Sequence, residues 1–123
     1  MTITIIGTGY VGLVTGTCFA EMGNTVTCVD IDQQKIDNLN KGIIPIYEPG
    51  LEELIKSNSA ANRLFFTKSL KATMKNSNMF LIAVGTPESP NGEANMDYVY
   101  SAVREIGENL VQESIIVNKS TVP

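Results

Sequence analysis

Histidine is absent from this sequence of 123 residues, and cysteine occurs only twice. Zinc sites draw most of their ligands from these two residue types, so we expect no metal site. Cys18 and Cys28 both lie within apolar runs. We interpret them as small buried hydrophobic residues, and not as a disulfide or a reactive pair.

Long apolar runs and clusters of basic residues are lacking as well. No run approaches the roughly 20 apolar residues that a membrane-spanning helix needs, and no basic region precedes the first apolar run, as it would in a signal peptide. Nine basic and thirteen acidic residues give a net charge of −4, and an acidic surface repels the phosphates of nucleic acid. We therefore expect a soluble, cytoplasmic protein whose partners include neither a membrane nor nucleic acid.

Patterns typical of strands alternate with helical patterns along the whole chain. Apolar and β-branched runs predict five strands, at Thr2–Ile6, Thr25–Val29, Leu64–Thr67, Asn78–Val84 and Ser114–Asn118. Helical spacing predicts helices between them, at Tyr10–Met22, Asp32–Lys41, Gly50–Ser57, Ser69–Lys75 and from Asn95 or Asp97 to Leu110. This alternation predicts a Rossmann-type, doubly wound α/β fold, whose parallel sheet has the strand order 3-2-1-4-5 and right-handed crossovers.

The apolar spacing also predicts which helix residues face the sheet. In the first helix these are Val11, Val14, Cys18 and Met22, and in the last they are Val99, Ala102, Val103, Ile106 and Leu110. A sheet of this type normally gains a sixth strand, for which the sequence has no pattern. We interpret residues 1–123 as one dinucleotide-binding domain that is truncated after its fifth strand.

A glycine-rich turn, Gly7-Thr8-Gly9-Tyr10-Val11-Gly12, follows the first predicted strand and opens the first predicted helix. In the matching G-x-G-x-x-G motif, the first glycine allows a sharp turn, the second lets the backbone approach a pyrophosphate, and the third lets the helix pack closely. The N–H groups at the helix start, around Tyr10 and Val11, then face the phosphates. A match alone is weak evidence, but its place in a β-α-β unit of about 30 residues predicts a dinucleotide site.

Asp30 ends the second predicted strand, eighteen positions after Gly12. A carboxylate at this place accepts hydrogen bonds from the adenosine ribose hydroxyls and repels a 2′-phosphate, so Asp30 favours NAD over NADP. An ordinary polar residue at a strand end is the alternative, which the glycines and the spacing make the weaker one. Lys35 has two interpretations, a contact to the adenosine ribose or a solvated lysine on a helix face.

Three further segments carry a resemblance to a known family. They are Ile46-Tyr47-Glu48-Pro49-Gly50-Leu51, Val84-Gly85-Thr86-Pro87 and Asn118-Lys119-Ser120-Thr121-Val122-Pro123. In order and spacing they resemble the N-terminal NAD-binding domain of the UDP-glucose/GDP-mannose dehydrogenase family, and the resemblance extends over all 123 residues. E-P-G-L and K-S-T-V-P are more specific than the glycine turn, because other dinucleotide folds do not combine them. The tyrosine before E-P-G-L is most similar to the UDP-glucose branch.

The resemblance implies an oxidoreductase of nucleotide-sugar metabolism and polysaccharide biosynthesis. Members of the family oxidise a sugar 6-hydroxyl to a carboxylate with two NAD, by way of a cysteine thiohemiacetal. Their catalytic cysteine, their central helical domain and their C-terminal sugar-nucleotide domain have no counterpart in this sequence, and neither Cys18 nor Cys28 stands in the place of that cysteine. We therefore expect the UDP-sugar to bind through a missing half, the full-length protein to be a homodimer, and the 123 residues alone to be inactive.

The resemblance also assigns roles to individual residues by position. The glycine turn and Asp30 would bind the adenosine diphosphate part of NAD, with help from Lys35. The residues expected to contact the cofactor's ribose and phosphate region from the end of the fourth strand are Val84, Gly85, Thr86 and Pro87. Thr121, with Ser120 beside it, is similar to a threonine near the nicotinamide and the reacting centre. The segment Tyr47–Leu51 we interpret only as an entry to a helix.

Two alternatives stay open at this point. UDP-N-acetylmannosamine and GDP-mannose dehydrogenases belong to the same family, and the sugar and base would be recognised by the missing half. A regulatory module that senses NAD without catalysis is an alternative of another class. Such a module needs the glycine turn and Asp30 but no residues after the fifth strand directed at the reacting centre, so Lys119–Pro123 favours the enzyme.

Overall fold

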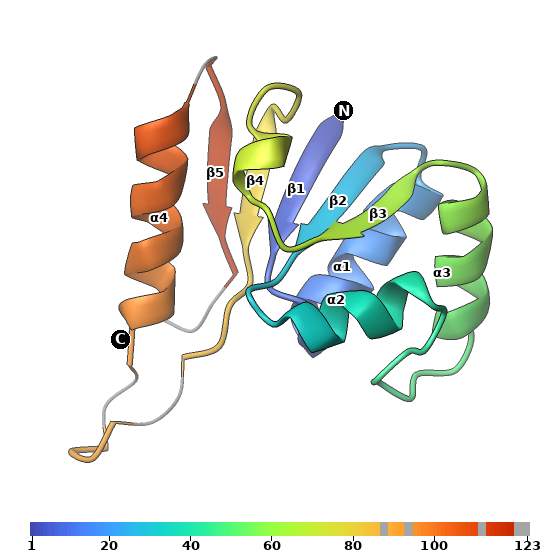
Figure 1. Ribbon diagram of the computed structural model, residues 1–123, viewed down its shortest axis with the longest axis horizontal. Coiled ribbons are helices and arrows are strands. Elements are labelled where there is room, and N and C mark those ends of the chain that lie inside the picture. The colour runs from blue at the N-terminus through green and yellow to red at the C-terminus, as the bar shows by residue number, and fades with distance from the viewer. Residues whose placement is uncertain (87–88, 93–94, 111–112, 120–123) are drawn as a thin grey trace.

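The computed structural model describes residues 1–86, 89–92, 95–110 and 113–119. Its strands are β1 (Thr2–Ile6), β2 (Thr25–Val29), β3 (Leu64–Thr67), β4 (Met79–Ile82) and β5 (Ile115–Asn118). Its helices are α1 (Tyr10–Glu21), α2 (Gln33–Asn40), α3 (Leu51–Ala60), the short 3₁₀ helix η1 (Lys71–Thr73) and α4 (Asp97–Asn109). The strands form one parallel sheet of order β3-β2-β1-β4-β5 (Figure 1), which confirms the predicted fold and strand order.

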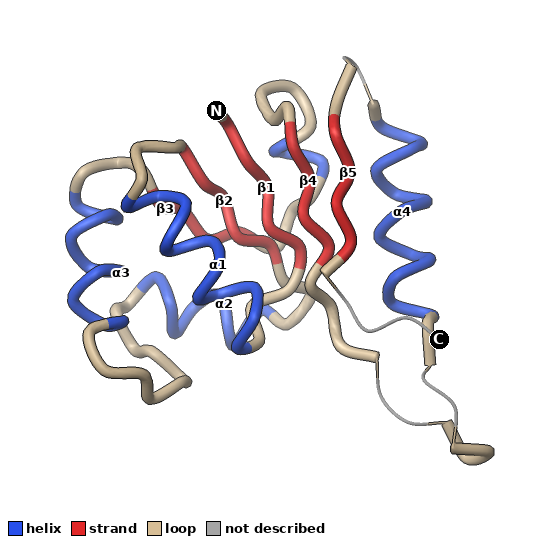
Figure 2. The backbone as a smooth tube through the Cα atoms, turned by 180° about the vertical axis from the view of Figure 1, so that it is seen from behind, coloured by secondary structure: helices blue, strands red, loops and turns tan. Residues whose placement is uncertain are grey.

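Two apolar clusters lie on opposite faces of this sheet, because successive side chains of a strand point to opposite faces. The first cluster joins α1, α2 and α3 to the face that contains Ile3, Ile5 and Leu81. The second joins α4 and the residues around η1 to the face that contains Ile6, Phe80 and Ile82. Figure 2 shows α1, α2 and α3 together on one side, with α4 along β5 at the edge of the sheet. Strand β4 is therefore apolar on both faces, because each of them is covered.

The buried face of α1 differs from the prediction. Val11 and Met22 are exposed, and Val14 is only half-buried. The residues that α1 buries are Gly12, Leu13, Gly16, Thr17 and Ala20. Most of these are small, and they let the helix axis approach the sheet closely: a Cβ on Gly16 would stand 2.9 Å from the Cys28 Sγ atom. The close approach, and not the largest apolar side chains, decides which side of α1 is covered.

This rotation of α1 separates the two cysteines. Cys28 is fully buried, as predicted. Cys18 is exposed, which contradicts its interpretation as a buried residue. It lies one position after Thr17, whose hydroxyl is buried and donates to the Leu13 carbonyl oxygen at 2.7 Å.

In α4 fewer of the predicted apolar residues are buried against the sheet than expected. Val99, Ala102 and Ile106 are buried, but Val103 and Leu110 are 44% and 42% exposed. The residues that α4 buries pack with Ile6, Phe80 and Ile82, so only a narrow strip of the helix is covered.

Candidate functional site

Gly7 ends β1 at a crowded point of the carboxyl edge of the sheet. Its φ of +109° is a conformation that side-chain-bearing residues rarely adopt. Its N–H donates to the Val29 carbonyl oxygen at 2.7 Å, and a Cβ on it would stand 2.4 Å from the Ala83 carbonyl oxygen. The turn therefore needs glycine here both for its backbone angle and for the close passage of the chain that leaves β4.

Gly12 and Gly9 differ in what surrounds them. A Cβ on Gly12 would stand 2.0 Å from the Gly7 carbonyl oxygen, so the first turn of α1 packs directly on the glycine turn. A Cβ on Gly9 would have no described atom within 4 Å, and the extended backbone of Gly9 (φ −72°, ψ −170°) suits any residue. The fold thus requires glycine at 7 and 12 but not at 9. The space in front of Gly9 is open to a ligand.

The N-terminus of α1 opens beside this space. Tyr10 and Val11, its first two residues, are 54% and 46% exposed. Within the described residues no side chain caps this end, and the first turn of the helix carries no acidic residue. The N–H groups of a first helical turn have no partner inside the helix and lie at the positive end of its dipole. Together with the open space at Gly9, they form a cradle suited to a phosphate.

Asp30 lies just after β2, next to the glycine turn. Its Oδ2 atom accepts hydrogen bonds from the Thr8 N–H (3.0 Å) and the Thr8 hydroxyl (2.7 Å), and its Oδ1 atom accepts one from the Asp32 N–H (2.9 Å). Burial raises the pKa of Asp30, but the hydrogen bonds from Asp32 and Thr8, with the charge of Lys35, lower the pKa overall. The carboxyl group is therefore ionised at neutral pH.

These contacts give Asp30 a second task, which the sequence did not indicate. It braces the glycine turn through Thr8, a residue that is 2% exposed. A carboxylate has about four acceptor positions. Among the described residues Oδ1 accepts from one donor and Oδ2 from two, so Oδ1 is the oxygen more available to a ligand hydroxyl. The N–H and the hydroxyl of Thr8, which belongs to the predicted cofactor-binding turn, both donate to Asp30.

Lys35 lies in the first turn of α2, on the same side as Asp30. Asp32 caps this helix, because its Oδ1 atom accepts from the N–H groups of Gln34 (3.0 Å) and Lys35 (3.3 Å). The exposed ammonium group of Lys35 is close enough for its charge to lower the pKa of Asp30. It thus lies next to the carboxylate of the candidate site.

The segment after β4 meets the glycine turn at the same edge of the sheet. Ala83 touches Gly7, and the next three residues, Val84, Gly85 and Thr86, continue from that contact. Gly85 is exposed and Thr86 is half-buried, whereas Val84 packs on the second apolar cluster. The structure therefore brings the backbone of Ala83 and Val84 against the turn, since the Val84 Cα atom would stand 3.1 Å from a Cβ on Gly7.

Three predicted site residues, Pro87, Ser120 and Thr121, lie outside the described residues. The last described position, Lys119, donates its N–H to the Ile82 carbonyl oxygen at 2.7 Å. The end of β5 is thereby aligned with the end of β4, at the same edge as the glycine turn.

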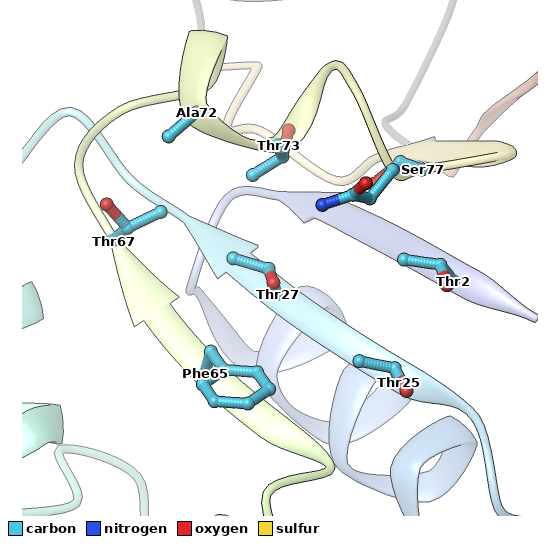
Figure 3. Close-up of a pocket in the computed structure, with 9 residues that line it drawn as sticks. Thr2, Thr25, Thr27, Phe65, Thr67, Ala72, Thr73 and Ser77 are labelled. Atoms are coloured by element: carbon cyan, nitrogen blue, oxygen red, sulfur yellow. The ribbon is translucent and has the colours of Figure 1, made fainter.

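A hollow of about 570 Å³ lies elsewhere, on the sheet face opposite to α1 (Figure 3). Its lining consists of Thr2, Thr25, Thr27, Phe65, Thr67, Ala72, Thr73, Asn76 and Ser77. None of these side chains is ionisable, and none of the lining residues belongs to the glycine turn. We therefore assign the candidate site to the turn and not to this hollow. Over residues 1–86, 89–92, 95–110 and 113–119 no group of three potential metal ligands occurs, and no helix is long and apolar enough to cross a membrane.

The arrangement at the edge of the sheet fits a dinucleotide, with a phosphate cradle at Gly9 and an ionised carboxylate one strand away. The family model for the NAD-binding domain of the UDP-glucose/GDP-mannose dehydrogenases matches residues 1–123. The chain belongs to this family. The cofactor that its domain binds is therefore NAD, as predicted.

Relatives and solved structures agree with this assignment. UDP-glucose 6-dehydrogenase TuaD of Bacillus subtilis is 55% identical over 121 residues, which are 98% of this chain and 26% of that protein. UDP-glucose 6-dehydrogenase of Rhizobium meliloti is 54% identical over 124 residues, covering 100% of this chain and 28% of the relative. The chain thus spans about a quarter of the length of these relatives.

The fold of the chain is shared with solved members of the family. The ternary complex of GDP-mannose dehydrogenase from Pseudomonas aeruginosa superposes with a TM-score of 0.93 at 38% identity, over 99% of this chain and 29% of that one. UDP-glucose dehydrogenase from Pyrobaculum islandicum gives a TM-score of 0.93 at 36% identity, with the same coverage of 99% and 29%. Family members that differ in their sugar nucleotide therefore share this domain.

Proposed function

We propose that this chain is the NAD-binding part of a UDP-glucose 6-dehydrogenase, which oxidises the sugar 6-hydroxyl to a carboxylate with two NAD. The observation that carries the cofactor role is the open space at Gly9, beside the first turn of α1. The relatives at 45–55% identity, which are named UDP-glucose 6-dehydrogenases, support the choice of substrate. We place the sugar-nucleotide site, the catalytic cysteine and a dimer interface in the part of such a protein that lies beyond these 123 residues, and the protein in the cytoplasm.

The proposal gives roles to the residues around the open space at Gly9. The N–H groups of Tyr10 and Val11 bind the pyrophosphate, to which Gly9 presents no side chain. The Oδ1 atom of Asp30 accepts a hydrogen bond from an adenosine ribose hydroxyl, and Lys35 lies next to that carboxylate. When held by these residues, NAD would supply the acceptor for the hydride of the substrate.

The remaining assignments rest on the family resemblance. Gly85 and Thr86, with Pro87, contact the ribose and phosphate region of the cofactor. Ser120 and Thr121 lie near the nicotinamide. The position of Lys119 at the edge shared with the glycine turn supports this assignment, because residues that follow it start from the cofactor side of the sheet.

GDP-mannose and UDP-N-acetylmannosamine are the alternative substrates. The structure of UDP-N-acetylmannosamine dehydrogenase from Pyrococcus horikoshii superposes with a TM-score of 0.93 at 32% identity, and the TM-score for GDP-mannose dehydrogenase is the same. An NAD sensor without catalysis is the alternative of another class. Steady-state assays of the full-length protein with the three sugar nucleotides decide among these, and an absence of turnover with all three would favour the sensor.

Cofactor preference tests the role of Asp30 directly in the 123-residue chain. Titration with NAD and NADP should show specific binding of NAD, because the ionised carboxylate accepts the ribose hydroxyl and repels a 2′-phosphate. In Asp30→Asn the preference should fall by about tenfold or more, since a hydrogen bond to a charged group contributes about 1.5–3 kcal/mol. Asp37→Asn, on the exposed surface of α2, is the control. Equal affinity for the two cofactors in the unmutated chain would show that the role assigned to Asp30 is wrong.

A further inference from the structure

The segment Tyr47–Leu51 joins α2 to α3, and the dehydrogenase function described above gives it no task. Its C-terminal end is anchored in the core, since Leu51 is 4% exposed and its N–H donates to the Glu48 carbonyl oxygen at 3.0 Å. Gly50 precedes α3 with a φ of +82°, which turns the chain into the helix. The side chain of Glu48 leaves this turn and reaches another helix: its Oε2 atom accepts a hydrogen bond from the Tyr10 hydroxyl at 3.1 Å.

Helix α3 is thereby attached to α1 at both ends, in two different environments. At its C-terminal end Asn58, which is fully buried, donates to the Glu21 Oε2 atom at 2.7 Å. At its N-terminal end the Glu48–Tyr10 hydrogen bond is exposed to solvent. The partly buried hydrogen bond between Asn58 and Glu21 contributes to stability, whereas water competes for the exposed one and its net contribution is small. The consequence of the Glu48–Tyr10 contact is therefore to be sought at the site and not in the stability of the fold.

Tyr10 occupies the place where its side chain matters most for a bound phosphate. It is the first residue of α1 and directly follows Gly9, in front of which the space is open. The Cα–Cβ bonds of a helix tilt toward its N-terminus, so the ring of a first residue stands beside the free N–H groups. Tyr10 is 54% exposed, so its neighbours leave the ring room to change rotamer. The hydrogen bond to Glu48 selects one orientation.

We propose that Glu48 is a positioning residue for the dinucleotide, because it holds the Tyr10 ring to the side of the phosphate cradle at the start of α1. The segment Tyr47–Leu51 thus forms a clasp between α3 and the cofactor site. The pKa of the Tyr10 hydroxyl is raised by the hydrogen bond and by the negative charge of Glu48, so the proton that makes this contact stays in place well into the alkaline range. The inference rests on the proposed NAD binding at this turn.

The affinity of the 123-residue chain for NAD tests the clasp. Immobilising a free side chain on binding costs about 0.5–1.5 kcal/mol, so Glu48→Ala and Tyr10→Phe should each weaken NAD binding by about 3- to 10-fold. The double variant should bind no more weakly than either single variant, because both changes break the same contact. Glu48→Gln keeps an acceptor oxygen and should retain the affinity. Glu53→Ala, which removes an exposed carboxylate two positions into α3, is the matched control.

The outcomes separate this inference from the proposed function. An unmutated chain that does not bind NAD overturns the proposed function itself. A chain that binds NAD equally well with and without Glu48, or a double variant whose losses add, overturns the clasp. Ultraviolet titration of the tyrosines supplies a second measurement that a purely structural role in α3 would not change. Ionisation of the Tyr10 hydroxyl, identified by its loss in Tyr10→Phe, should move to lower pH in Glu48→Ala.

Discussion

A side chain at Gly9 and a side chain at Gly12 would meet opposite surroundings, although the two glycines belong to one motif. The added Cβ at Gly9 has no described atom within 4 Å, and at Gly12 it would stand 2.0 Å from a backbone carbonyl oxygen. Substitutions at the two positions therefore test ligand binding and fold stability separately. We expect Gly9→Val to abolish NAD binding in a folded chain, and Gly12→Ala to destabilise the chain even without NAD.

The magnitudes follow from the backbone and from the contacts. At Gly9 the extended conformation suits a side chain, and replacing a glycine at such a place stabilises a protein by about 0.4–1 kcal/mol through the unfolded state. At Gly12 the overlap is with backbone, which cannot rotate away, so a cost of at least about 1–3 kcal/mol is expected. For a chain of this length, a change of 1 kcal/mol moves the melting temperature by roughly 3–5 °C.

Thermal unfolding followed by circular dichroism, and calorimetric titration with NAD, measure the two effects separately. Gly9→Val should melt at or slightly above the temperature of the unmutated chain and show no heat of binding. Gly12→Ala should melt several degrees lower. If a folded Gly9→Val chain keeps its affinity for NAD, the second glycine serves only the turn and the phosphate cradle is placed wrongly.

Three further predictions concern the cysteines, acid stability and the sheet edge. Burial raises the pKa of the Cys28 thiol to about 12, so a thiol reagent at pH 8 should label the exposed Cys18 quickly and Cys28 only after unfolding. Rapid labelling of both cysteines in the folded chain would contradict the structure. The folded-state pKa of Asp30 is lowered, so its ionisation stabilises the fold fully above the ordinary aspartate pKa of about 3.9 and less as pH falls toward the lower folded value. The free energy of unfolding of Asp30→Asn, measured with denaturant, should therefore lie furthest below that of the unmutated chain near neutral pH. A difference that grew in acid would contradict this expectation. Ile115 and Ile116 are 56% and 43% exposed on the edge strand β5, so the 123-residue chain should self-associate in sedimentation experiments. A monomer at high concentration, with slow amide exchange along this strand, would refute the expectation.

The local pattern of the sequence determined the elements and their order. Runs of apolar and β-branched residues placed all five strands within two residues of their observed bounds, because such side chains suit a strand that is buried in a sheet. The glycine turn and Asp30 could be located for a similar reason: their motif lies within one β-α-β unit, where neighbours in space are near in sequence. The order β3-β2-β1-β4-β5 followed from the usual strand order of the doubly wound fold, with right-handed crossovers.

The contacts between distant segments were decided by the tertiary structure alone. Apolar spacing pointed to Val11 and Met22 on α1, but the side covered in the fold is the one whose small residues allow the closest approach to the sheet. The hydrogen bond from Thr8 to Asp30 spans 22 positions and the one from Tyr10 to Glu48 spans 38, and the glycine-turn motif specifies neither of these contacts. A hydrogen bond depends on where two groups lie in space, and only the packed sheet and helices bring these partners within 3.1 Å.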